Sequence, residues 1–197
     1  MTVPSLQERR AALAREAILE ALVVHLEAGD VDTLGMEDLA REAGVSRRTL
    51  YRYFPTRDDL IAASGDWVRS QVLGLDPAIG EGGIAASFRT GVARMQGRPQ
   101  LARALLATES GRALRGNYRS ARVDAIRRQV RDLAPGLSRR DSDRAAAVLA
   151  YLCSLQAWIS LQDESGLTPE RAQDALLWAI ALIENDIITH DRKRTTR

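Results

Sequence analysis

Helical periodicity runs along almost the whole chain of 197 residues, and no stretch alternates apolar and polar residues convincingly enough to indicate a strand. Glycines, prolines and capping residues divide this pattern into segments. We expect helices at about 6–28, 36–43, 47–53, 57–73, 84–96, 99–108, 117–133, 139–163 and 168–190. The sequence therefore predicts an all-α protein with about nine helices in total.

Capping sequences mark the start of several of these helices. Ser5 with Glu8, and Thr56 with Asp59, have the spacing of a capping box, and Gly29 is placed to end the first helix. The apolar residues of that first helix repeat at helical spacing and should form its buried stripe: Leu13, Ala17, Ile18, Ala21 and Leu22.

Composition excludes several classes of protein. Hydrophobic residues make up 45% and charged residues 27%, as in an ordinary globular protein. The single cysteine, Cys153, excludes an internal disulfide and a cysteine-rich zinc site. There is no apolar N-terminal run of the signal-peptide type, so we expect a cytoplasmic location. With two histidines and no phosphate-binding glycine loop, we expect neither an enzyme nor a metal or other cofactor.

Residues 36–60 predict two short helices joined by a tight turn, with a third helix directly after them. Gly44 suits the left-handed residue of such a turn, and Ser46 suits the cap of the next helix. Leu50 and Phe54 lie four residues apart and should face inward. This pattern is typical of a helix-turn-helix, at about 35–54.

The outward face of the second short helix carries arginines and hydroxyl groups but no acid. Residues 1–64 hold 8 arginines and 11 acidic residues, so the basic character is confined to this one element. We expect leading arginines to read guanine, Thr49 to meet thymine, and the tyrosines and Arg57 to contact phosphate. The predicted contacts to double-stranded DNA are Ser46, Arg47, Arg48, Thr49, Tyr51, Arg52, Tyr53 and Arg57.

This stretch resembles the DNA-binding domain of the TetR family of bacterial repressors. The matching runs are EDLA at 37–40, TLYRYF at 49–54 and RDDL at 57–60, and the similarity covers roughly residues 10–62. The resemblance implies a DNA-binding domain at 1–62 and an effector-binding and dimerisation domain at 63–197. It also implies a homodimer formed by the last two helices, and release of the operator when a ligand changes the spacing of the two reading helices.

Two residues depart from the family pattern. Gly35 stands where the family usually has a Ser or Thr that caps the second helix and touches phosphate. His25 lies on the core stripe of the first helix, where the family commonly has Phe. We favour a core histidine hydrogen-bonded to the backbone over a pH switch at this position.

The last two expected helices, at about 139–163 and 168–190, contain long apolar stretches. Residues 145–162 carry no charge, and residues 175–183 are apolar on every face. Such helices must be buried on every face. Because polar residues interrupt the first run and it barely reaches spanning length, we expect no membrane insertion. Packing on the chain itself and on a second copy is the favoured interpretation.

Candidate effector contacts lie in helices that form the pocket in the proteins this chain resembles, although core packing also explains each of them. They are Trp67, Phe88, Met95, Leu105, Tyr118, Tyr151, Leu155 and Trp158. Residues 89–144 hold 14 arginines against 5 acids, and Arg112, Arg115, Arg119 and Arg122 share one helical face. This row indicates either a solvated face or an anionic effector, such as a carboxylate or an acyl-CoA thioester.

The favoured function is a homodimeric repressor that binds a pseudo-palindromic operator and is released by a small lipophilic or anionic effector. One alternative is a ligand-independent dimeric DNA-binding module, and a less favoured one is an enzyme with an appended helix-turn-helix. Activation in place of repression stays open, because it depends on where the operator lies relative to a promoter.

Overall fold

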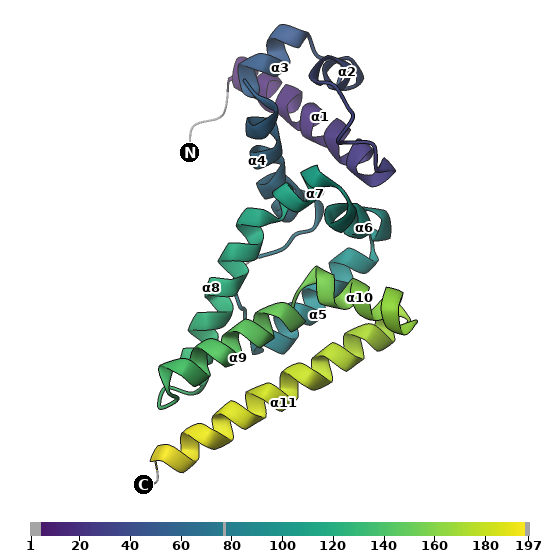
Figure 1. Ribbon diagram of the computed structural model, residues 1–197. Helices are drawn as coiled ribbons and strands as arrows, with labels where there is room; N and C mark the ends of the chain where they lie inside the picture. Colours follow the sequence, from purple (N-terminus) through teal and green to yellow (C-terminus); the bar gives the residue numbers. More distant parts are fainter. Residues whose placement is uncertain (1–4, 77, 196–197) are drawn as a thin grey trace. The chain divides into compact units, whose positions relative to one another are not determined.

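A computed structural model describes residues 5–76 and 78–195, and within them it contains helices and no strand. The expected all-α class is confirmed (Figure 1). Eleven α-helices and one π-helical segment lie in these residues, where about nine helices were expected. They are α1 (Leu6–Ala28), α2 (Met36–Glu42), α3 (Arg47–Tyr53), α4 (Arg57–Trp67), η1 (Val68–Val72), α5 (Gly83–Gln96), α6 (Pro99–Ala107), α7 (Glu109–Leu114), α8 (Gly116–Leu133), α9 (Arg139–Leu152), α10 (Leu155–Ser165) and α11 (Pro169–Thr195).

The chain divides into two compact units. The first unit contains the residues up to Leu73 together with Arg103–Asn117, and the second contains Gly74–Ala102 and the residues from Tyr118 onward. Helices α1 to α4 and α7 therefore belong to the first unit, whereas α5 and α9 to α11 belong to the second. The expected boundary between residues 62 and 63 separates a DNA-binding domain from an effector-binding and dimerisation domain. Compact packing does not test these functions, so this boundary stays a prediction.

One face of α1 forms the core of the first unit. Ile18, Leu22 and Leu26 are buried there, where α1 packs against α2, α3 and α4. Leu13 was expected in the same stripe, and that prediction is wrong because its side chain is 65% exposed. The buried residues of α1 begin only at Ile18, so the apolar period of the helix extends beyond its packed part.

The short helix α7 was not expected from the sequence, and it packs closely on α4. A side chain at Gly65 of α4 would place its Cβ 2.7 Å from the carbonyl oxygen of Leu114, so glycine permits this approach. Thr108 caps α7 by accepting a hydrogen bond from the Gly111 N–H at 2.9 Å. This cap separates α7 from α6.

The expected long helix at 139–163 is wrong, because the structure divides it into α9 and α10 with a bend of 60° between them. Ser154 caps α10 by accepting a hydrogen bond from the Ala157 N–H at 3.0 Å. Within the described ranges no single helix has the length and apolar character needed to cross a membrane; only this bent pair reaches them jointly.

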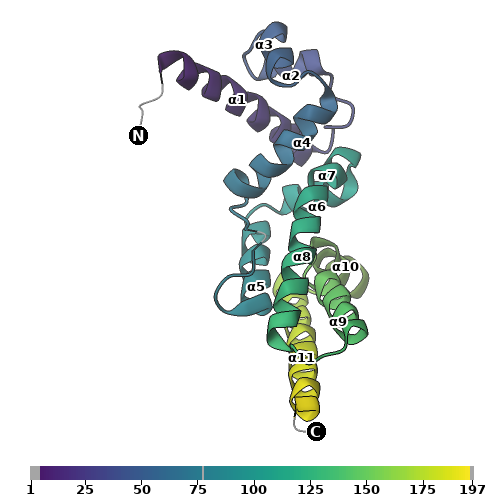
Figure 2. The ribbon, with the colours of Figure 1, turned by 90° about the vertical axis from the view of Figure 1, so that its left-hand side faces the viewer.

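The ends of two other helices differ from expectation. The helix that starts at Arg57 changes at Trp67 into the π-helical segment η1, which ends at Val72. The last helix, α11, continues to Thr195 instead of ending near His190. In the second unit α11 contacts α5, α9 and α10, and Figure 2 shows it beside these helices.

Candidate functional site

A buried pair of apolar side chains holds α3 against the rest of the first unit. Leu50 and Phe54 are 0% and 2% exposed, as the sequence predicted. The turn before α3 is fixed by Gly44, whose φ of 66° is in the left-handed region. The Val45 N–H donates to the Ala40 carbonyl at 3.0 Å. The outer face of α3 is therefore held in a defined orientation.

Hydroxyl groups cap α3, whereas α2 has no side-chain cap. The Ser46 Oγ accepts a hydrogen bond from the Thr49 N–H at 3.1 Å, and the Ser46 and Thr49 hydroxyl oxygens are 2.9 Å apart. Gly35 is the N-cap residue of α2 and makes no side-chain cap hydrogen bond. The first N–H groups of α2 thus remain available to a phosphate, although no side chain assists them.

The two leading arginines of α3 differ in their surroundings. Arg47 Nη1 forms an ion pair with Glu37 Oε1 of α2 at 2.7 Å, and both side chains are mostly exposed. Arg48 is exposed and has no hydrogen bond or ion pair within the described ranges. The sequence did not predict the ion pair between Glu37 and Arg47, because the two residues lie in different helices on either side of the turn. Arg48 is therefore the leading arginine without a competing acid.

The remaining polar side chains of α3 interact with each other. Arg52 Nη2 donates to the Tyr53 hydroxyl oxygen at 2.9 Å, and its Cζ is 4.8 Å from the Tyr53 ring centre. Tyr51 is 36% exposed, and Arg47 Cζ is 5.6 Å from its ring centre. Because these groups lie at the surface of α3, they remain accessible to a negatively charged partner.

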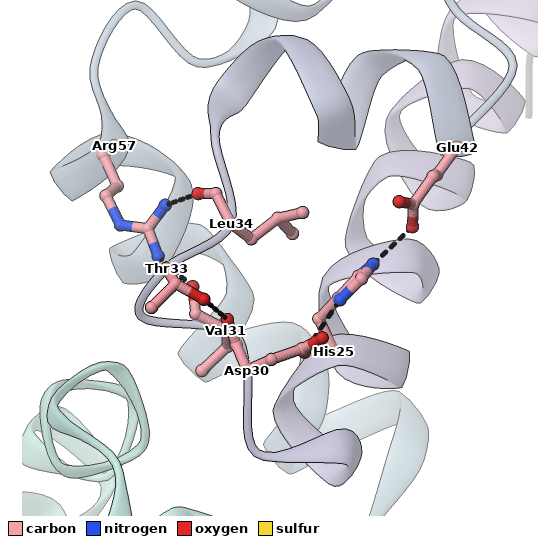
Figure 3. Close-up of polar contacts among 7 residues, drawn as sticks. All are labelled: His25, Asp30, Val31, Thr33, Leu34, Glu42 and Arg57. Atoms are coloured by element: carbon pink, nitrogen blue, oxygen red, sulfur yellow. Dashed lines mark hydrogen bonds and ion pairs between the residues drawn. The ribbon is translucent and has the colours of Figure 1, made fainter.

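Arg57 has a role that the sequence did not predict. Its Nη1 donates to the Leu34 carbonyl at 2.7 Å, and its Nη2 donates to the Val31 carbonyl at 2.5 Å (Figure 3). The guanidinium is partly buried and holds the loop between α1 and α2, residues 30–34, which we call the anchoring loop. Both terminal nitrogens face protein carbonyls, so a contact of Arg57 with phosphate would require it to share or exchange these partners, and that contact stays a prediction.

His25 also binds the anchoring loop, and its partners are carboxylates instead of the expected backbone groups. Its Nδ1 is 2.8 Å from Asp30 Oδ1, and its Nε2 contacts Glu42 Oε2 of α2 (Figure 3). The side chain is only 16% exposed. The hydrogen bond with Glu42, followed by the interactions with Asp30, raises the pKa of His25 above its ordinary value, although burial opposes this. His25 thus joins α1, the anchoring loop and α2.

A third contact joins the anchoring loop to α7. The Asp32 carboxylate accepts hydrogen bonds from the Glu109 N–H at 2.7 Å and from the Ser110 N–H at 2.9 Å. The hydrogen bonds from Ser110, and then that from Glu109, lower the pKa of Asp32. An acid that caps a helix from a distant part of the chain has no local sequence signal, so sequence reasoning missed it.

The local geometry of α1 to α4 has counterparts among known proteins. The sequence profile described as "Bacterial regulatory proteins, tetR family" matches residues 18–64, which cover the packed part of α1 and most of α4. Over these residues the chain matches the tetR family. This is a family of DNA-binding transcriptional regulators and not of enzymes.

Curated relatives are similar to the chain over the same segment. The HTH-type transcriptional repressor LfrR of Mycolicibacterium smegmatis is 41% identical over 63 residues, which are 32% of each chain. An uncharacterized HTH-type transcriptional regulator of Mycobacterium tuberculosis is 43% identical over 58 residues, which are 29% of each chain. The chain thus spans about a third of the length of the curated relatives it matches.

Solved structures extend the similarity to the fold. A transcriptional regulator from Rhodococcus sp. Rha1 has a TM-score of 0.63 and 18% identity, over 88% of this chain and 97% of that one. A putative TetR-family transcriptional regulator from Rhodococcus sp. has a TM-score of 0.59 and 20% identity, over 88% and 99%. At these identities the likeness shows the fold alone.

The second unit contains a cavity of about 70 Å³. Five of the eight predicted effector contacts line it, namely Phe88, Met95, Tyr118, Leu155 and Trp158. The other three lie elsewhere, because Tyr151 is 58% exposed and Trp67 and Leu105 belong to the first unit. Lining residues that were not predicted include Ile84, Val92, Ile126 and Cys153, and Arg122 of the predicted arginine row also lines the cavity.

The predicted arginine row does not form one face in the structure. Arg115 Nε donates to the Leu105 carbonyl at 2.7 Å, and Arg112 Nη1 donates to the Ala107 carbonyl at 2.9 Å. Arg119 is exposed, whereas Arg122 lines the cavity. The interpretation as a solvated face is therefore wrong for Arg115 and Arg122. Arg115 contacts α6, and Arg122 lies in a cavity formed by several helices. Helical spacing within one helix does not predict contacts with other helices.

Proposed function

We propose that this chain is a homodimeric repressor that binds a pseudo-palindromic operator in double-stranded DNA and is released by a small effector. The single observation that carries the proposal is the exposed basic surface of α3, which rests on buried Leu50 and Phe54. A helix of this size enters the major groove, and side chains near its N-terminus reach base edges. We call Arg47, Arg48, Thr49, Tyr51 and Arg52 the reading face.

Within the reading face, Arg48 is the first candidate for base recognition. Its guanidinium has no competing partner in the described ranges, so it can donate two hydrogen bonds to guanine O6 and N7. Arg47 must exchange Glu37 for DNA before it does the same. Arg52, with its tyrosine neighbours, is placed to contact phosphate, which fixes the register without reading sequence. Arg57 would have to exchange its carbonyl partners before it contacts phosphate.

Exposed apolar side chains on α9 and α11 support a homodimer. Val148 and Tyr151 of α9 are 45% and 58% exposed, and Trp178 and Leu182 of α11 are 68% and 50% exposed. A groove of about 610 Å³ between these helices is lined by Val148 and Leu182. Exposed apolar surface of this kind is a common mark of an interface. A two-fold symmetric dimer would contain two copies of α3, and a pseudo-palindromic operator with half-sites about one helical turn apart could bind both.

Repression and effector release are supported by different observations. LfrR, one of the similar proteins, is a repressor by name, which favours repression over activation. The cavity of the second unit offers a place for an effector. Its volume of about 70 Å³ also favours a second candidate, a ligand-independent dimeric DNA-binding module. Pockets for drug-sized ligands usually measure roughly 300–1,000 Å³.

The test begins with duplexes that the full-length chain selects from a random pool. Fluorescence anisotropy measures their affinity, and sedimentation velocity measures how many copies bind. We expect a two-fold repeated sequence that binds two copies. Trp178→Arg should give a monomer with weakened operator binding, whereas Glu170→Arg, an exposed position at the start of α11, serves as the control. One copy bound to an asymmetric sequence would contradict the proposal.

A promoter fusion separates the remaining alternatives. With the selected operator overlapping a promoter, the repressor should lower reporter expression, and an activator would raise it with the operator placed upstream. Expression that no small molecule restores would favour the ligand-independent module.

A further inference from the structure

Arg122 of α8 places a positive charge in a cavity that is otherwise mostly apolar. The apolar lining includes Ile84, Phe88, Ile126, Leu155 and Trp158. The Nε of Arg122 is buried and has no hydrogen-bond partner among the residues that the structure describes. Within the same residues, its Nη2 makes a long hydrogen bond, 3.4 Å, to the Ala150 carbonyl. A buried cation with so few acceptors is energetically costly, so the cavity suits a ligand that brings an acceptor to Arg122.

The neighbours of Arg122 do not neutralise it. Burial raises the pKa of the Cys153 thiol to about 12, so this group is uncharged at neutral pH. The Tyr118 ring centre lies 5.9 Å from Arg122 Cζ and interacts with the cation, but a ring face offers no acceptor to Nε. Among the described lining residues only Asp76 has a carboxylate, and this exposed side chain accepts the Ala78 N–H at 2.8 Å.

A second polar group of the lining can assist an anion. The Ser154 Oγ accepts the Ala157 N–H as the cap of α10, which leaves the hydroxyl proton available to donate. One guanidinium and one hydroxyl are suited to a single carboxylate. A thioester of coenzyme A fits less well, because its negative charges are far from its acyl group and would not lie in the apolar cavity.

We propose that the cavity is a binding site for a monocarboxylate with a compact apolar body, whose carboxylate accepts hydrogen bonds from Arg122. The apolar body lies among the aromatic and aliphatic side chains of α5, α8 and α10. The small volume, about 70 Å³, selects against long chains. That such a ligand releases the operator rests on the function proposed above, whereas its binding does not.

The test compares molecules of one shape and different charge. Benzoate with benzamide, and hexanoate with hexanamide, are titrated into the full-length chain by calorimetry, and thermal unfolding is followed in parallel. We expect at least one carboxylate to bind tenfold or more tightly than its amide and to raise the Tm. Equal binding within both pairs, or no binding of either carboxylate at millimolar concentration, would overturn the proposal.

Variants assign the preference to one side chain. Arg122→Met should abolish the preference for the carboxylate and raise the Tm of the unliganded chain, because it removes an unpaired buried cation. Arg122→Lys should retain part of the preference, and Arg119→Met, at an exposed neighbouring position, should retain all of it. A carboxylate preference that persists in Arg122→Met would contradict the assignment.

Operator binding is measured separately by anisotropy. Release of the operator by the carboxylate, and not by its amide, would support the effector role. Carboxylate binding without release would establish the site and contradict only that role. If the chain did not bind the operator even without a ligand, the result would instead count against the proposed DNA-binding function.

Discussion

The reading face and the anchoring loop use charged side chains in opposite ways. On the reading face, Arg48 is exposed and without a partner in the described ranges. At the anchoring loop, Arg57 donates to two carbonyls, and Asp32 accepts from two N–H groups of α7. The charged groups of Arg57 and Asp32 form hydrogen bonds within the protein, whereas the guanidinium of Arg48 is exposed and can bind a partner molecule. A site that must meet a partner precisely benefits from such a rigid support.

The largest expected effect comes from removing Arg57, the side chain of α4 that holds the anchoring loop. Arg57→Ala should lower the free energy of unfolding by about 3 kcal/mol, because two charge-assisted hydrogen bonds disappear and two carbonyls lose their donor. Denaturant unfolding measures this change. Arg48→Ala is the matched control and should unfold like the unaltered chain. If the two variants had the same free energy of unfolding, Arg57 would contribute no more to stability than the exposed Arg48, and the proposed difference between the anchoring loop and the reading face would be wrong.

The next largest effect is on DNA affinity, where the important residue is Arg48. Arg48→Ala should weaken operator binding by about 1–3 kcal/mol and relax the preference at one base pair. Anisotropy with the operator and with random duplexes measures both quantities. If Arg48→Ala weakened binding to both duplexes equally, Arg48 would be a phosphate contact and not a base contact.

A smaller effect is expected at the junction of the anchoring loop with α7. Asp32→Ala should cost about 1 kcal/mol of stability, because α7 loses its distant cap. The folded-state pKa of Asp32 lies below its ordinary value of 3.8, so the carboxylate stabilises the fold above that pH. This stabilisation is lost as the pH falls through the lowered pKa of Asp32. At low pH the unaltered protein and Asp32→Ala should therefore have similar free energies of unfolding. Asp32→Asn, which keeps an acceptor, should lose less.

The smallest effect is a dependence of stability on pH that arises from His25. Its folded-state pKa is raised by Glu42 and Asp30, so the stabilisation is fully present below the unfolded value of 6.5 and is lost as the pH rises through the folded value. The Tm advantage over His25→Phe should therefore shrink from about pH 6 to pH 8. The exposed His190, replaced in the same way, serves as the control. An advantage that grows with pH would contradict the assigned partners.

Local features of the helix-turn-helix could be predicted from the sequence because their partners are three or four residues away. The Ser46 and Thr56 caps, the left-handed Gly44 and the buried Leu50 all follow from such short spacings, and the structure has each of them. The hydrogen bond of Arg57 to Val31 could not be predicted, because its acceptor is 26 residues away and no local pattern specifies it.

The second unit was less predictable for the same reason. Periodicity identifies residues that are apolar, but whether they share a cavity depends on how distant helices pack. Phe88 and Trp158 meet in one cavity, whereas Tyr151 faces outward. The break between α9 and α10 was missed because an uncharged run looked continuous, although the capping residue Ser154 lies within it.

The first unit is assembled from two separate stretches of chain, and this limits how proteins of this kind can be recombined. A segment ending at Leu73 would lack Arg103–Asn117, and with them the helix end that Asp32 caps and the backbone that approaches Gly65. A chimera that transfers only the N-terminal stretch onto another regulator would inherit the reading face and leave the anchoring loop without part of its support. A chimera built to transfer the proposed reading face should therefore include both stretches of the first unit.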